Sequence, residues 1–240
     1  LYERKIALKD GSSDTRSGYW VHVDGALGAA YMPFLEKIGD IDFPVFDFQI
    51  PEVHSICMSG HKWIGAPWPC GIFMSKVKYQ MRPVENPEYI GSPDTTFSGS
   101  RNGFSALILW DFISSNSVKR LTERIQRGEE LAQYTLQKLD EVKEAHKGLE
   151  LWVEYSPHAL TVRFRQANDR IVFKYSLSNE TLYVDDDEPV RAYSHIYLMD
   201  SVTKGLIDKL TDDLKAKDAF KSDEALNECK HIHGRGLGFK

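Results

Sequence analysis

The chain has 240 residues, of which 42% are hydrophobic and 27% charged, and its formal net charge at pH 7 is -5. This composition is typical of a globular protein with a sizeable core, and it argues against intrinsic disorder. A negative net charge provides no basic field for nucleic acid or anionic lipid, and no apolar run approaches the roughly 18 residues of a membrane-spanning helix. We therefore expect neither nucleic acid nor membrane as a partner.

The first part of the chain has the pattern of an α/β domain. Residues 19–24 and 54–59 are apolar runs that predict two buried strands, and residues 71–74 predict a third. Residues 77–103 are rich in Pro, Gly and polar side chains, so we expect a long loop there. Loops of that length in a compact domain are usually functional or disordered.

Apolar residues at helical spacing follow this loop. They predict one helix that Ser105 caps, and a second helix from about residue 118 to residue 145. The break near these helices suggests a domain boundary. We predict an α/β piece at residues 1–115, and a linking helix with a smaller α+β piece at residues 116–240.

After Gly148 the pattern changes again. Four short apolar segments predict strands, at residues 151–153, 160–164, 171–173 and 196–199. Residues 202–215 then place apolar side chains on one face of a closing helix.

Two short motifs carry the candidate chemistry. His22-Val23-Asp24-Gly25-Ala26 ends the first predicted strand, and Ser59-Gly60-His61-Lys62 ends the second. An Asp at a strand end is common, but a lysine directly after a buried strand is less so. At the carboxyl ends of two strands, Asp24 and Lys62 could face the same crevice, where α/β sheets bind ligands.

Pyridoxal 5'-phosphate (PLP) requires such a pair. A lysine amine forms an imine with its aldehyde, and a carboxylate pairs with its pyridinium nitrogen, so that the ring can accept electrons from a carbanion. Ala26 suits a position where the chain approaches a flat ring closely, and Ser59 and His61 carry donors suited to a phosphate.

The segments HVDGA, SGHKWIGAPWPCG and GSRNG resemble those of the PLP-dependent group II amino acid decarboxylases, a family of fold type I. They are most similar to the branch that contains bacterial histidine decarboxylases and plant serine decarboxylases. The resemblance runs from about Gly18 to Trp110 and returns more weakly between His195 and Leu214. It implies an α/β fold of the PLP-dependent transferase type, in which residues 1–115 are the C-terminal part of the large α/β domain and a smaller α+β domain follows.

The resemblance also implies roles for individual residues. Lys62 would be the catalytic lysine that holds PLP, and Asp24 would pair with the pyridine nitrogen. Ala26 would pack under the ring, while Ser59 and His61 would contact the phosphate.

Ser100 and His195 can each be interpreted in two ways. The loop before Ser100 resembles the family's mobile catalytic loop, which would place Ser100 near the phosphate or substrate of a neighbouring subunit. Alternatively, residues 100–102 form a turn that caps the following helix. His195 falls near where related decarboxylases hold the substrate carboxylate, but a satisfied histidine on a strand is the favoured interpretation.

Part of the family's site is not among the motifs of this chain. The family's N-terminal half supplies a histidine that stacks on the PLP ring and a loop that cradles the phosphate, and neither lies within residues 1–21. We therefore expect a second segment or chain to complete the site. We also expect a homodimer with the active site at its interface, because the loop predicted at 77–103 would otherwise have no site to complete. Many relatives have HVDAA where this chain has Gly25, which we interpret as a tolerable change.

The leading hypothesis is that an L-amino acid, small or polar, is decarboxylated to its amine and CO₂. One alternative is another PLP reaction of the same fold, such as that of an aminotransferase or a cysteine desulfurase. A desulfurase needs a mobile reactive cysteine, whereas Cys57 and Cys70 lie beside predicted strands. The other alternative is an inactive truncated homologue, against which the intact Asp24 and Lys62 argue.

Cysteine usage predicts the compartment. Three cysteines without CxxC spacing form no disulfide framework, so we expect a cytoplasmic protein. Residues 1–5 do not resemble a secretory signal. Two clusters of metal-ligand types occur. We interpret Cys229, His231 and His233 as a polar tail and residues 185–188 as a solvated acidic turn, so no metal site is predicted.

Overall fold

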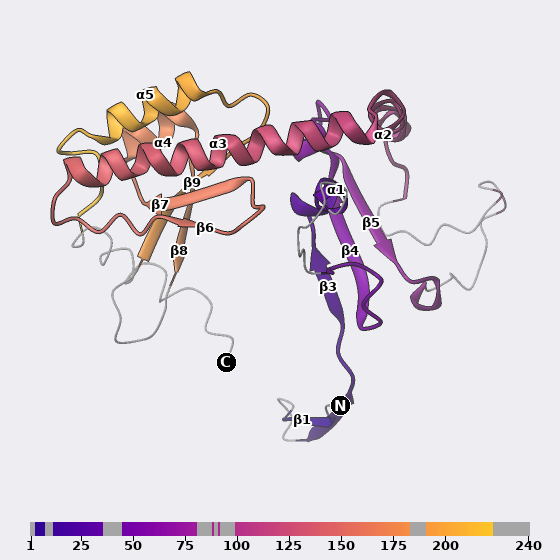
Figure 1. The fold of residues 1–240 in the computed structure, drawn as a ribbon. Helices are drawn as coiled ribbons and strands as arrows, with labels where there is room; N and C mark the ends of the chain where they lie inside the picture. Colours follow the sequence, from indigo (N-terminus) through magenta and orange to yellow (C-terminus); the bar gives the residue numbers. More distant parts are fainter. Residues whose placement is uncertain are drawn as a thin grey trace. The chain divides into compact units, whose positions relative to one another are not determined.

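The computed structural model describes residues 3–7, 12–35, 45–80, 88, 91, 99–182 and 191–222. The chain divides into two compact units, residues 1–122 and residues 123–240, shown in Figure 1. Helix α3 (Val118–Ala145) begins in the first unit and continues in the second. The domains predicted for residues 1–115 and 116–240 stay a prediction.

A three-stranded sheet lies at the centre of the first unit. Strand β3 (Val21–Asp24) is parallel to β4 (Val53–Ser59), and β5 (Gly71–Ser75) is antiparallel to β4 on its other side. All three strands were predicted, and the first two end at the predicted residues. Two short strands that were not predicted, β1 (Glu3–Ala7) and β2 (Ser13–Ser17), form a separate antiparallel pair.

Short helical segments and one longer helix surround this sheet. They are η1 (Gly28–Ala30), α1 (Met32–Leu35), η3 (Gly60–Ile64), η4 (Val77–Tyr79) and α2 (Gly103–Ser115). Trp63 of η3 is almost fully buried, and its ring lies 5.9 Å from that of Tyr31 and 6.0 Å from that of Phe112. This aromatic cluster fixes η3 against α2, and thereby the turn that carries Lys62.

The start of α2 differs from its prediction. Asn102, not Ser105, is the N-cap, because its side chain accepts a hydrogen bond from the N–H of Phe104 at 3.0 Å. The hydroxyl of Ser105 instead accepts from Nε1 of Trp68 at 2.8 Å. Most of the loop predicted at 77–103 lies outside the described residues, apart from η4 at its start.

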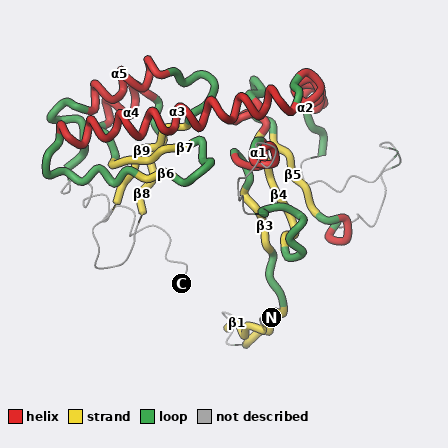
Figure 2. The backbone as a smooth tube through the Cα atoms, viewed as in Figure 1, coloured by secondary structure: helices red, strands yellow, loops and turns green. Residues whose placement is uncertain are grey.

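The second unit contains a four-stranded antiparallel sheet in the order β6-β7-β9-β8 (Figure 2). Its strands are β6 (Glu154–Tyr155), β7 (Thr161–Arg165), β8 (Ser178–Leu182) and β9 (Arg191–Tyr197). The strand predicted at 160–164 is confirmed as β7, and the one at 196–199 overlaps the end of β9. Strand β8 was not predicted, because its sequence SNETL is mostly polar.

Two other predicted strands were wrong. Residues 171–173 belong to helix α4 (Asp169–Tyr175), whose N-cap Asn168 accepts from the N–H of Ile171 at 2.9 Å. A short apolar run does not distinguish a strand from one turn of a partly buried helix. Residues 151–153 precede β6, and Trp152 has a φ of 47°, which is incompatible with an extended strand.

Helices α3, α4 and α5 (Lys204–Leu214) cover one face of this sheet (Figure 1). The core between them contains fully buried apolar residues of both layers, among them Leu139, Val162, Phe164, Ile171 and Leu214. Alternate residues of β9 point away from this core, which leaves a polar sheet face opposite the helices. In the described part of the chain, no helix is both long and apolar enough to cross a bilayer.

Candidate active site

Asp24 is the last residue of β3, and its carboxylate is exposed. Oδ1 accepts the backbone N–H of Ala26 at 3.1 Å and the thiol of Cys57 at 3.4 Å. These two hydrogen bonds, the Ala26 N–H first, lower the pKa of Asp24, and the charges of Lys62 and His22 lower it further. Asp24 is therefore an ionised carboxylate at the carboxyl end of its strand.

Lys62 lies three residues beyond the end of the neighbouring parallel strand. Its backbone, with φ -93° and ψ -110°, leaves the helical conformation in the middle of η3. The N–H of Ala66 closes this wide turn by donating to the carbonyl of Gly60 at 2.9 Å, and Gly65 ends it with a φ of 87° that favours glycine. Lys62 is exposed and forms no hydrogen bond or ion pair with another described residue, so its amine is available for covalent chemistry.

His61 precedes this lysine and is held by the start of β5. The N–H of Cys70 donates to Nδ1 of His61 at 3.0 Å, while the N–H of Gly60 donates to the carbonyl of Cys70 at 2.7 Å. The imidazole is exposed. The Cys70 contact thus orients the His61 ring and leaves Nε2 for another partner.

Ala26 and Ser59 join the two motifs directly. The N–H of Ser59 donates to the carbonyl of Ala26 at 3.0 Å. The segment after Asp24 also packs tightly on β4, because a Cβ on Gly25 would lie 2.5 Å from Cβ of Ala29 and 2.8 Å from the carbonyl oxygen of Cys57. The structure thus brings together the five residues that the two motifs predict, at the carboxyl ends of β3 and β4.

Ser100 belongs to the first unit, three residues before the start of α2, and is exposed. Its neighbour Asn102 caps the helix, so this part of the GSRNG motif has a structural role. A role for Ser100 near the phosphate or substrate stays a prediction.

His195 lies in the second unit, on β9. Its Nε2 is 3.2 Å from Oε2 of Glu180, and its ring stacks on that of Tyr197. Burial lowers the pKa of His195, and Glu180 opposes that effect. With Glu154, Thr161 and Arg163 it lines a shallow polar groove of about 590 Å³. The histidine has a strand position and an acidic partner, as the favoured interpretation expected, and its role toward substrate stays a prediction.

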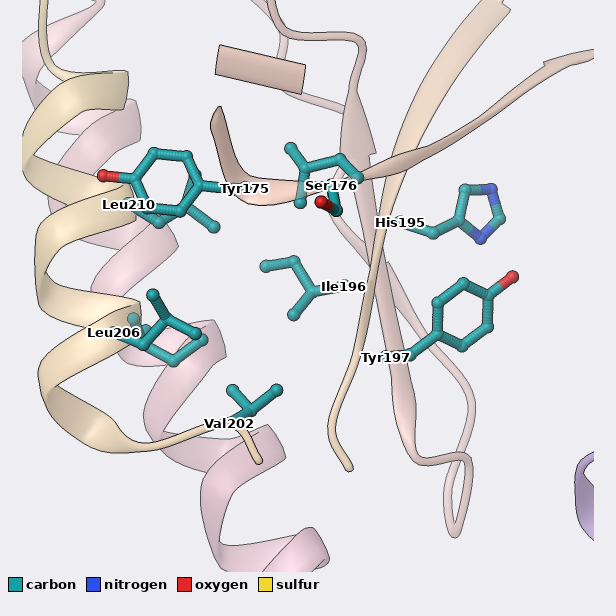
Figure 3. Close-up of a pocket in the computed structure, with 10 residues that line it drawn as sticks. Tyr175, Ser176, His195, Ile196, Tyr197, Val202, Leu206 and Leu210 are labelled. Atoms are coloured by element: carbon teal, nitrogen blue, oxygen red, sulfur yellow. The ribbon is translucent and has the colours of Figure 1, made fainter. Parts of the chain in front are cut away.

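The opposite side of β9 is apolar. Figure 3 shows Ile196 pointing toward Leu206 and Leu210 of α5, while His195 and Tyr197 point away from that helix. The small pocket between them, of about 110 Å³, contains no cluster of reactive groups. We therefore do not take it as the candidate active site.

The two described cysteines have structural surroundings. Cys70 is 5% exposed, and the thiol of Cys57 is half-buried and donates to Asp24. Cys57 lies within β4 and Cys70 is buried directly before β5, whereas a desulfurase needs a mobile reactive cysteine. The contact between Cys57 and Asp24 was missed by sequence reasoning, although strand alternation could have indicated it once the register was known.

No three His, Cys, Asp or Glu side chains gather as metal ligands within the described ranges. The polar tail with Cys229, His231 and His233, and the acidic turn at 185–188, both lie outside those ranges.

These residues fit PLP. An ionised carboxylate, an available lysine amine and an oriented imidazole stand at adjacent strand ends, and the close packing of Gly25 brings the backbone against β4. Asp24 would pair with the pyridine nitrogen, Lys62 would bind the aldehyde, and His61 would donate to the phosphate.

Comparisons with known proteins agree with this chemistry. A family described as "Pyridoxal-dependent decarboxylase conserved domain" matches residues 8–166. A histidine decarboxylase of Mesorhizobium japonicum is 34% identical over 214 residues, covering 85% of this chain and 52% of the relative. A histidine decarboxylase of Vibrio campbellii is 36% identical over 163 residues, covering 68% and 39%. The chain thus spans about half the length of the curated relatives it matches, or less.

Solved structures show the same fold. The L-methionine decarboxylase from Streptomyces sp. 590, in complex with L-methionine methyl ester, superposes with a TM-score of 0.74 and 43% identity, covering 88% of this chain and 45% of that one. A sphingosine-1-phosphate lyase of Burkholderia pseudomallei, with a TM-score of 0.56 and 20% identity over 89% of this chain and 48% of its own, shares the fold alone. The prediction of a fold-type-I PLP architecture is confirmed.

Proposed function

This chain belongs to the pyridoxal-dependent decarboxylase family, and from that premise we propose that the whole protein decarboxylates an L-amino acid to the corresponding amine and CO₂. The observation that carries this proposal is the placement of Asp24 and Lys62 at the carboxyl ends of two adjacent parallel strands. PLP, when bound, supplies a ring that accepts the electron pair released as CO₂ leaves.

The residues of this chain prepare that chemistry. Asp24, kept ionised by the Ala26 N–H and the Cys57 thiol, holds the proton on the ring nitrogen. Lys62 would hold the cofactor through its aldehyde. His61, oriented by Cys70, holds the phosphate. Together they orient the ring before any substrate arrives.

The substrate class follows from the relatives only in part. This chain resembles both relatives named histidine decarboxylase and a solved structure named L-methionine decarboxylase. Proteins similar to this chain are therefore named for substrates with different side chains. We propose a small or polar L-amino acid as the substrate, and histidine and methionine are the first to test. Selectivity among amino acids depends on the residues that contact the substrate side chain. Asp24 and Lys62, which we propose hold the cofactor, do not determine it.

We also propose that further protein surface completes the site, as a segment of the same protein and as the second subunit of a homodimer. Large apolar side chains of α2 support this proposal, because each is half exposed or more: Phe104, Leu107, Trp110 and Ile113. Exposed apolar patches of this kind typically mark surfaces that another segment or chain covers. A cytoplasmic location is proposed from the cysteine usage alone.

The test is an absorption spectrum of the whole protein with added PLP, beside Lys62→Ala and the control Lys78→Ala. Lys78 is an exposed lysine of η4 in the same unit. We expect a visible band in the wild type and in Lys78→Ala, and none in Lys62→Ala. Absence of the band from the wild type would overturn the proposal.

A screen of amino acids for CO₂ release then separates the alternatives. Release of CO₂ with formation of the amine supports a decarboxylase. A keto acid without CO₂ would instead indicate an aminotransferase, and sulfur released from cysteine would indicate a desulfurase. A protein that shows the band but turns over none of these substrates would fit an inactive homologue.

A further inference from the structure

The thiol of Cys57 lies beside the carboxylate that PLP requires. Cys57 is the register partner of Asp24 across the parallel strands β3 and β4. Because paired residues of neighbouring strands point to the same face of a sheet, the two side chains meet, and Sγ lies 3.4 Å from Oδ1 of Asp24. Oδ1 also accepts the N–H of Ala26, at 3.1 Å.

Two donors therefore converge on one oxygen of the carboxylate. The second oxygen, Oδ2, has no hydrogen-bond partner among the described residues. A carboxylate held through one oxygen by donors from two directions cannot rotate freely about its last bond. Its other oxygen then stays available to a ligand, because the Asp24 side chain is exposed.

We propose that Cys57 is a positioning residue for Asp24, whose S–H, together with the Ala26 N–H, occupies Oδ1 and reserves Oδ2 for the ring nitrogen of the cofactor. This inference rests on the proposed function, since it assumes that Asp24 binds PLP. It assigns to a cysteine the task of a hydrogen-bond donor and not that of a nucleophile.

Packing alone does not explain a cysteine here. Cys57 is half-buried, so it contributes less to the core than its neighbour Ile56, which is 3% exposed. An apolar residue would serve such a position equally well, but it would leave Oδ1 with one donor. The thiol also helps to keep Asp24 ionised, second only to the Ala26 N–H. A bare thiol is a weak donor, but hydrogen bonds to a charged acceptor are stronger than neutral ones.

The experiment measures the affinity of the whole protein for PLP, by titration of the visible band, as the pH is lowered through the range in which carboxylates titrate. Cys57→Ala and Cys57→Val both remove the donor, and the valine keeps the volume. Cys57→Ser restores an O–H. Phe73→Leu is the control for the sheet face, because Phe73 is the partner of Cys57 on β5 and its ring stacks on that of His22 at 5.9 Å, while the variant leaves the thiol in place.

We expect PLP binding about three- to tenfold weaker in the alanine and valine variants, as for the loss of one ordinary hydrogen bond, because the thiol is a weak donor. Their loss of PLP at acid pH should begin at a higher pH than in the wild type, because Asp24 then protonates more readily. Cys57→Ser should recover most of the affinity for PLP. Its acid limb, which is the pH range over which PLP is lost on acidification, should return to that of the wild type. Phe73→Leu should leave the acid limb unchanged.

Three results would overturn the inference while leaving the proposed function intact. The first is that both Cys57→Ala and Cys57→Val bind PLP with wild-type affinity and lose it over the same acid pH range as the wild type. The second is an equal loss in Cys57→Ser, which would assign the effect to the size of sulfur. The third is an equal shift in Phe73→Leu, which would assign it to the sheet face as a whole. A wild type that binds no PLP would instead contradict the proposed function itself.

Discussion

The backbone N–H of Cys70 donates to Nδ1 of His61 at 3.0 Å, and this single contact decides what the imidazole offers to a ligand. The carbonyl of Cys70 also lies 3.2 Å from Nδ1, but it already accepts the N–H of Gly60 at 2.7 Å. The N–H of Cys70 has no other acceptor among the described residues. In the neutral ring Nδ1 is therefore the acceptor, and Nε2 carries the proton.

His61→Asn is expected to distinguish the structural role of Nδ1 from the ligand-binding role of Nε2. The amide oxygen of Asn can accept from Cys70 as Nδ1 does, but Asn places no donor where Nε2 lies. PLP affinity of the whole protein should fall about tenfold or more, as for the loss of a charge-assisted hydrogen bond, while the thermal stability of the PLP-free protein stays the same. His61→Ala should also lower that stability by about 1–3 kcal/mol, because it leaves the buried N–H of Cys70 unpaired. Unchanged PLP affinity in His61→Asn would show that His61 does not contact the phosphate.

Gly25→Ala would introduce the alanine that many relatives carry. From the sequence we interpreted that difference as tolerable, but in this chain the alanine should destabilise the site, because the space beside Gly25 is filled. The added Cβ would lie 2.5 Å from Cβ of Ala29 and 2.8 Å from the carbonyl oxygen of Cys57, so the segment after β3 must move away from β4. We expect a loss of about 1–3 kcal/mol of stability, typical of overpacking, and weaker PLP binding. Gly103→Ala is the control, since its Cβ would meet no atom within 4 Å. Equal stability of the two variants, measured by thermal unfolding, would contradict this expectation.

The GSRNG motif should divide into a structural and a ligand-binding part. Asn102→Ala removes the N-cap of α2 and should cost about 1 kcal/mol of stability, whereas Asn102→Asp keeps the acceptor and should not. Ser100→Ala should leave stability unchanged and reduce PLP affinity or turnover. Thermal unfolding together with PLP titration distinguishes the two effects. A purely structural turn would show loss of stability in both alanine variants and no separate effect of Ser100 on PLP.

His195 should make the stability of this protein sensitive to acid. Burial lowers its pKa in the folded chain below the ordinary value, so the unfolded chain takes up the proton at a higher pH than the folded chain does. The unfolded state then binds more protons, and stability falls as the pH drops below about 6.5. His195→Gln should lack this part of the acid sensitivity.

Glu180→Gln should increase the same sensitivity. Glu180 is the group that raises the pKa of His195, so its removal leaves burial unopposed. The measurement is the unfolding temperature of both variants and the wild type from neutral to mildly acid pH. Parallel curves for wild type and His195→Gln would show that another group dominates the acid response.

The sequence alone determined the strand ends and the chemistry that they carry. Apolar runs ending at Asp24 and Ser59, together with the SGHK motif, were sufficient to predict a carboxylate and a lysine at the carboxyl ends of two strands. Helical spacing likewise predicted α3 from residue 118 to residue 145. These features depend on local patterns, which each segment carries independently of the rest of the chain.

Only the tertiary structure decided which side chains surround that pair. Cys57 meets Asp24 because of the register between β3 and β4, and His61 meets Cys70 because β5 folds back antiparallel to β4. The same holds for residues 171–173, which form a helix once Asn168 caps them and Ile171 packs on the second sheet. Register, caps and packing join residues that are distant in sequence, and a one-residue shift in pairing would exchange every neighbour, so no local pattern specifies them.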